Sequence, residues 1–248
     1  MKTSHLILAA LLAPIPASVL VSCAQINSAM NTVGLGIGAK QTLETDVDDL
    51  RSMRSELEAS WAAIQSRTAS LEQDVANFGP GDHLGSSGVD LAVLSDDILN
   101  AAEVEAREAG AVDVETVDIE AAYRETDAAT RAEIQEVQAE GRRIMTELKS
   151  GIPTSVATLG TEAGKTVARA AAIQLKAEKM ESVAAKNPLM TEENMKTMRS
   201  NQALIQKEVD QLSVLAERIA SESNGITGRM SQALATFQGK VATLKTVR

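Results

Sequence analysis

The chain has 248 residues, a formal net charge of −10 at pH 7 and only 2% aromatic residues. The acidic balance argues against a nucleic-acid partner and against electrostatic docking on anionic lipid. The scarcity of aromatic residues removes the stacking platforms of single-strand binders and disfavours a β-sandwich. Ala, Glu, Gln, Leu and Met are prominent and have good helix propensity, so the composition predicts an all-α protein.

Residues 1–22 have the parts of an export signal. Lys2 supplies a positive charge at the start, and an apolar run follows over residues 6–12. Pro14 and Pro16 interrupt the apolar character, and the run is far shorter than the ~20 apolar residues that a membrane span needs. The sequence therefore predicts a signal peptide that is removed on processing.

The signal ends in Leu20-Val21-Ser22-Cys23, which contains the only cysteine of the chain. This segment resembles the lipobox of bacterial lipoproteins: an aliphatic residue, a tolerant position, a small residue and then cysteine. The resemblance covers only residues 1–23 and implies cleavage between Ser22 and Cys23, a diacylglyceryl group on the Cys23 sulfur and an acyl chain such as palmitate on its new amine. Two or more chains make a stable anchor. The alternative is an ordinary signal peptide in which Cys23 has no role.

The lipobox resemblance also implies a location. Ala24 follows Cys23 where an aspartate would retain a lipoprotein at the inner membrane under the enteric sorting rule. We therefore expect a bacterial envelope protein, anchored in the outer membrane and facing the periplasm, with exposure at the cell surface left open. Residues 23–39 are rich in Asn, Ser and Gly and are predicted to form the lipidated N-terminus and a flexible tether.

The strongest periodic signal is an apolar seam with steps of four and three residues, which predicts a helix over 41–77 with coiled-coil-like packing. Gly79-Pro80-Gly81 is expected to end it. The seam consists of Leu43, Val47, Leu50, Arg54, Leu57, Trp61, Ile64, Thr68, Leu71, Val75 and Phe78.

Arg54, Trp61 and Thr68 are the exceptions in this seam, because aliphatic residues occupy most of its other positions. A polar residue at a seam position costs stability and often fixes register or partner choice. In the alternative, Arg54 lies along the helix and extends its guanidinium to solvent. The sequence leaves both readings open.

Further helices are predicted over about 90–109, up to about 149, over about 155–186 and from an N-cap at Thr191 to near the C-terminus. The glycines and prolines between these segments favour a chain that folds back on itself. Residues 40–248 are therefore expected to form one elongated all-α bundle of long antiparallel helices with heptad packing. The alternative is an extended coiled-coil oligomer.

Few residues are suited to catalysis or metal binding. Removal of the signal leaves His83, in a loop over 79–88, as the one histidine, and Cys23 would be acylated, so no Cys/His zinc site remains. Residues 160–166 approach a phosphate-binding loop but have three residues between the two glycines where the motif needs four. We expect no enzyme activity, metal, cofactor or small-molecule substrate.

These observations predict a lipid-anchored, non-enzymatic scaffold, spacer or adaptor for other envelope proteins. Its partners would be the membrane, through the lipid, and either other envelope proteins or further copies of the chain, through the helical seams. The alternative is a membrane-active helical protein in the style of pore-forming toxins, in which residues 33–39 or another apolar stretch would insert.

Overall fold

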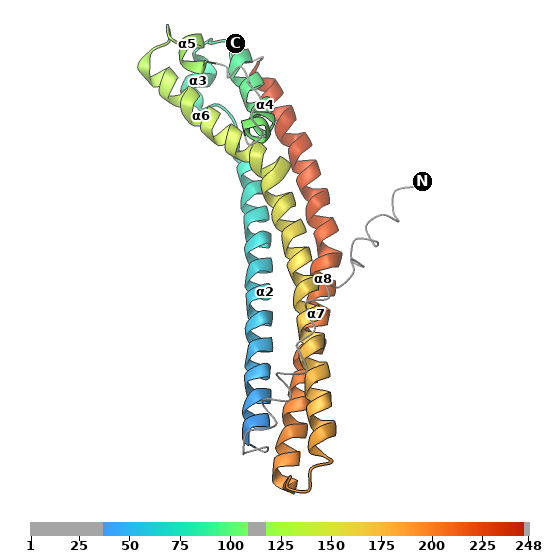
Figure 1. Cartoon of the computed structure of the whole chain (residues 1–248). Helices are drawn as coiled ribbons and strands as arrows, with labels where there is room; N and C mark the ends of the chain where they lie inside the picture. The colour runs from blue at the N-terminus through green and yellow to red at the C-terminus, as the bar shows by residue number, and fades with distance from the viewer. Residues whose placement is uncertain (1–36, 109–117, 246–248) are drawn as a thin grey trace, which may run out of the picture. The chain divides into compact units, whose positions relative to one another are not determined.

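The computed structural model describes residues 37–108 and 118–245 of the chain, and every regular element in these ranges is a helix. The prediction of an all-α helical bundle is confirmed. The predicted signal peptide and Cys23 lie outside the described residues. The elements in chain order are α2 (Ile37–Asn77), α3 (Asp82–Ser86), α4 (Ala92–Glu108), α5 (Ile119–Ala122), α6 (Ala128–Thr146), the π-helix η3 (Glu147–Gly151), α7 (Ile152–Ala184) and α8 (Glu192–Leu244). Figure 1 labels the α-helices.

The chain divides into two compact units. Unit 1 combines residues up to 60 with residues 159–220, and unit 2 combines residues 61–158 with residues from 221 onward. Unit 1 therefore contains the first part of α2, most of α7 and the first part of α8. Unit 2 contains the remaining parts of these helices together with α3, α4, α5, α6 and η3.

Unit 1 is built from three helices packed along their lengths. Hydrogen bonds from Gln174 to Gln206 (2.6 Å) and from Arg199 to Glu181 (3.0 Å) tie α7 to α8, and the opposite order of the numbers shows that the two helices are antiparallel. The seam leucines of α2 in this unit are buried, as the heptad pattern predicted. They are Leu43, Leu50 and Leu57.

Helix α7 contributes the smallest side chains to the interior of unit 1. Ala163, Ala170, Ala177 and Ala184 recur every seven residues, and all four are buried. The distance between packed helix axes depends on the side chains at the contact, so an alanine seam allows α7 to approach its neighbours closely.

Unit 2 has a core of larger side chains. Phe78 and Phe237 make an edge-to-face contact with ring centroids 4.8 Å apart, a favourable geometry for aromatic pairs. The buried hydroxyl oxygen of Tyr123 accepts a hydrogen bond from the backbone N–H of Leu94 (3.2 Å), which joins α4 to the end of α5.

Within unit 2, α2 and α8 run in the same direction. Gln65 bonds to Glu222 (3.0 Å), and further along both helices the Lys240 amine donates to the carbonyl of Phe78 (3.2 Å). The segment formed by α6, η3 and α7 lies between α2 and α8 in the chain and runs in the opposite direction. Consecutive long helices are therefore antiparallel, as predicted, and the first and third long helices are parallel.

The break predicted between the helix up to about 149 and the helix from about 155 is wrong, because α6 continues through η3 into α7 without a loop. Ile144, Leu148, Ile152 and Val156 are all buried and follow one another in three consecutive steps of four residues. A regular seam alternates steps of four and three residues, so three consecutive steps of four contain one residue more than the regular pattern. The wider π turn absorbs an extra residue and keeps the seam facing inward.

The remaining helix predictions can be compared directly. Helix α4 begins at Ala92, close to its predicted start, and the backbone N–H of Asn194 donates to Thr191 (3.2 Å), which confirms the predicted N-cap of α8. The predicted loop over 79–88 contains a short helix, α3, that the glycines of the segment concealed.

Candidate functional site

Arg54, the charged residue of the first seam, pairs with a buried carboxylate inside unit 1. Its Nε donates to Oε2 of Glu208 on α8 (3.0 Å), while one of its terminal nitrogens lies 3.4 Å from Glu58. The Glu208 side chain is only 7% exposed, and Arg51 lies 3.4 Å from its second oxygen. The hydrogen bond to Glu208 raises the pKa of the Arg54 guanidinium, with smaller effects from burial and from Glu58. Arg54 therefore does more than extend to solvent.

A second charge pair lies in the same unit. The amine of Lys176 on α7 donates to both carboxylate oxygens of Asp46 on α2, each at 2.9 Å, and the Asp46 side chain is 10% exposed. Glu208 joins α2 to α8, whereas Asp46 joins α2 to α7. The two pairs thus tie α2 to both other helices of unit 1 through carboxylates of low exposure. The assignment of Arg54 as a register residue stays a prediction.

Trp61 and Thr68, the other seam exceptions, belong to unit 2 and are buried there. The indole N–H of Trp61 donates to Glu222 on α8 (3.2 Å), while the Thr68 hydroxyl has no hydrogen-bond partner. Both side chains are therefore covered by the chain's own helices. Their assignment as register residues stays a prediction, and they do not form an exposed docking surface.

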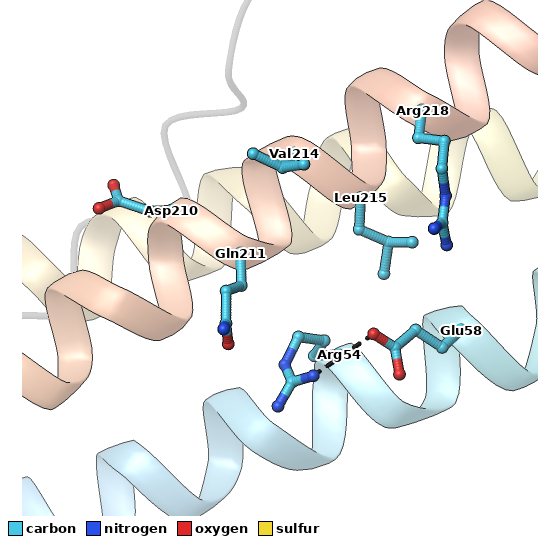
Figure 2. A pocket seen from close by; sticks show the side chains of 7 residues that line it. All are labelled: Arg54, Glu58, Asp210, Gln211, Val214, Leu215 and Arg218. Atoms are coloured by element: carbon cyan, nitrogen blue, oxygen red, sulfur yellow. Dashed lines mark hydrogen bonds and ion pairs between the residues drawn. The ribbon is translucent and has the colours of Figure 1, made fainter.

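A shallow groove of about 320 Å³ lies on the surface of unit 1 between α2 and α8 (Figure 2). The buried side chain of Leu215 forms part of its floor, and Val214 beside it is 66% exposed. The charged and polar residues around these two are Arg54, Glu58, Asp210, Gln211 and Arg218.

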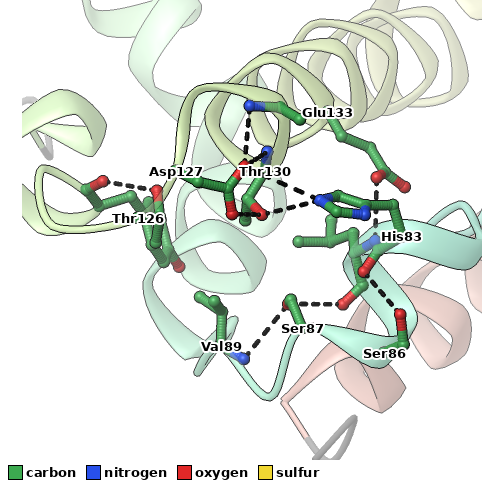
Figure 3. A network of polar contacts seen from close by, with 11 residues as sticks. His83, Ser86, Ser87, Val89, Thr126, Asp127, Thr130 and Glu133 are labelled. Atoms are coloured by element: carbon green, nitrogen blue, oxygen red, sulfur yellow. Dashed lines mark hydrogen bonds and ion pairs between the residues drawn. The ribbon is translucent and has the colours of Figure 1, made fainter.

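Unit 2 contains a polar network at the start of α6 (Figure 3). The buried hydroxyl of Thr130 donates to Asp127 (2.7 Å) and lies 3.2 Å from Nε2 of His83 in α3. Asp127 also accepts the backbone N–H groups of Ala129 and Thr130, so it is the N-cap of α6. These hydrogen bonds lower the pKa of Asp127 to about 2.

The contacts of this network position α3 and are not arranged for catalysis. Thr130 is only 1% exposed and its proton is already directed at Asp127, so its hydroxyl cannot reach a substrate. Glu133, one turn further along α6, accepts the backbone N–H of Leu84 (2.9 Å). Together with His83, this contact holds α3 against the first turns of α6.

The described parts of the chain contain no cluster of three or more His, Cys, Asp or Glu residues able to hold a metal. No helix among them is long and apolar enough to cross a membrane. Residues 160–166, the near-match to a phosphate loop, lie inside α7 and are helical throughout.

Glu208, Asp46 and Val214 were not among the site residues predicted from the sequence. Glu208 had a usable signal, because it lies three residues after buried Ile205 and four before buried Leu212, on the inner side of α8. Exposed Val214 had none, because the periodicity assigns it to no seam. Comparison of the chain with protein-family models, with curated proteins and with solved structures finds no match.

Proposed function

We propose that this chain is a lipid-anchored, non-enzymatic spacer or scaffold of the bacterial cell envelope. Cys23 would carry the lipid, and the helical units would present a rigid surface to other envelope proteins. The anchor rests on the lipobox resemblance at residues 20–23.

The observation that supports the spacer function is that two ion pairs with nearly buried carboxylates join the three helices of unit 1. A spacer must keep a defined length, and three long helices can slide against each other when only apolar contacts join them. Asp46–Lys176 and Arg54–Glu208 oppose sliding, because each pair has one side chain almost removed from water. Buried polar pairs that select one register at some cost in stability are a known use of such groups.

The anchor is tested with Cys23→Ala in the native cell. The variant should stay an uncleaved precursor or become a soluble periplasmic species, whereas wild type should incorporate labelled palmitate and stay with membranes after a carbonate wash. Ala24→Asp is the matched control, since it keeps the lipid and should only change the membrane that holds the protein. Membrane retention of Cys23→Ala, with no palmitate in wild type, contradicts the proposal.

The scaffold function is tested by photo-crosslinking from exposed positions of unit 1, such as Leu175 (51% exposed), in cells with wild-type protein. Reproducible products with other envelope proteins support it. Leakage of lipid vesicles caused by the full chain would instead favour a membrane-active protein.

A further inference from the structure

One exposed face of α8 carries an apolar residue between two opposite charges. Val214 is 66% exposed, Asp210 lies four residues before it and Arg218 four residues after it, and all three line the groove of unit 1. Residues four apart lie on the same side of a helix. Along this face of α8 an acidic residue, an apolar residue and a basic residue therefore follow one another.

We propose that this face binds a second copy of the chain, with the two α8 helices antiparallel and a two-fold axis passing at Val214. In such a pair, a residue a given number of positions before Val214 faces the residue the same number after Val214 in the other copy. Asp210 of each copy then faces Arg218 of the other, twice. The two Val214 side chains meet on the axis.

The neighbouring positions obey the same symmetry. Gln211 precedes Val214 by three residues and Glu217 follows it by three, so an amide that can donate faces a carboxylate that accepts. No like charges face each other at any of these positions. Because the axis repeats every contact, each favourable pair counts twice.

The groove provides room for the second helix. Leu215 and Val214 give an apolar strip, and Arg54 and Glu58 of α2 form the opposite wall (Figure 2). A helix from a second copy placed in this groove would contact both α2 and α8, and the two-fold axis would place α8 of the first copy in the corresponding groove of the second.

Other exposed apolar residues do not have this self-complementarity. Leu175 on α7 is 51% exposed, but the residues four positions before and after it are Ala171 and Lys179, which form no opposite pair. The charge pattern therefore selects the α8 face for self-association. This pairing goes beyond the spacer function and does not depend on the lipid.

Charge reversal in the full chain, held in detergent micelles, tests the symmetry. Asp210→Arg alone and Arg218→Asp alone each place like charges opposite twice, and each should weaken dimerisation about tenfold or more in sedimentation experiments. The double variant Asp210→Arg/Arg218→Asp restores both pairs and should recover the wild-type dimer. Glu162→Lys on α7 is the matched control and should leave it unchanged.

Cysteine crosslinking tests the axis directly. In a full chain carrying Cys23→Ser, Val214→Cys should form a disulfide-linked dimer under mild oxidation, and Ala171→Cys on α7 should not. A monomeric wild type at all concentrations, a double reversal no tighter than the single reversals, or preferential crosslinking through Ala171→Cys would each overturn the pairing. A wild-type chain that incorporates palmitate but stays monomeric would overturn this inference and leave the lipid anchor of the spacer proposal standing.

Discussion

The two units stabilise their helices with different kinds of side chain. Unit 1 buries alanines on α7 and places two carboxylates, Asp46 and Glu208, almost out of solvent beside their cations. Unit 2 holds all four aromatic residues of the chain, which are Trp61, Phe78, Tyr123 and Phe237. Unit 2 also buries a carboxylate beside a cation, since Arg142 donates to Asp97 (2.8 Å). Both units therefore contain buried charge pairs, and the large aromatic side chains are what distinguishes unit 2.

This difference has a physical basis. Alanine side chains are small and uniform, so a helix that presents only alanines packs almost equally well after sliding by one turn. Large aromatic side chains fit in one arrangement only, and a misfit leaves cavities that cost free energy. We therefore expect the aromatic side chains to restrict the packing of unit 2 more than the alanines of α7 restrict that of unit 1.

The largest expected effect concerns the aromatic contact of unit 2. Phe237→Ala removes a fully buried ring that packs on Phe78 and should lower the free energy of unfolding by about 3–5 kcal/mol. Trp61 is the only tryptophan and lies in unit 2, so its fluorescence reports the unfolding of that unit during denaturant titration. Phe237→Leu is the control and should cost less. A wild-type transition for Phe237→Ala would break the comparison.

The next effect concerns the charge pairs of unit 1. Arg54→Leu leaves the buried Glu208 carboxylate with Arg51 alone and should cost about 1–3 kcal/mol. The double variant Arg54→Leu/Glu208→Leu should recover wild-type stability or exceed it, since apolar replacement of a buried pair is often neutral or stabilising. Circular dichroism during thermal unfolding measures both. An equally stable Arg54→Leu would show that the pair contributes nothing.

Some features of the two units could be predicted from the sequence and others could not. The seam from Leu43 to Phe78 was predictable because burial recurs with the helical period, and only Arg54 departs from full burial. The inward position of Glu208 had a signal in the periodicity of α8, but its pairing with Arg54 did not, because the two residues lie 154 positions apart in the chain. The π turn was missed because Gly151 and Pro153 are typical of helix ends, and only packing shows that the helix continues.

A smaller effect distinguishes two buried threonines of unit 2. The Thr68 hydroxyl has no partner, so Thr68→Val should raise the free energy of unfolding by about 1 kcal/mol. Thr130 is equally buried but bonds to Asp127, so Thr130→Val should lower it. Trp61 fluorescence follows both variants in urea. The same sign of change for both would mean that hydrogen bonding does not decide the cost of a buried hydroxyl in this unit.

The smallest effect is a local response to acid at the start of α6. Hydrogen bonds from Thr130 and Ala129 lower the pKa of Asp127 from its ordinary value of 3.8 to about 2. A carboxylate whose pKa is lower in the folded state stabilises that state fully above the ordinary pKa and loses its contribution as the pH falls through the lowered one. Amide exchange at Ala129 and Thr130 should therefore accelerate, relative to the rest of α6, between about pH 4 and pH 2.

Asp127→Asn is the control that isolates this response. Asparagine also caps helices but does not titrate, so the variant should show weaker protection at neutral pH and no local acceleration in acid. The charge pairs of unit 1 lie on other helices and should leave this difference between the two proteins unchanged. An identical acid response in wild type and Asp127→Asn would assign it to general acid unfolding of unit 2, and the charge of Asp127 would then have no separate effect on the start of α6.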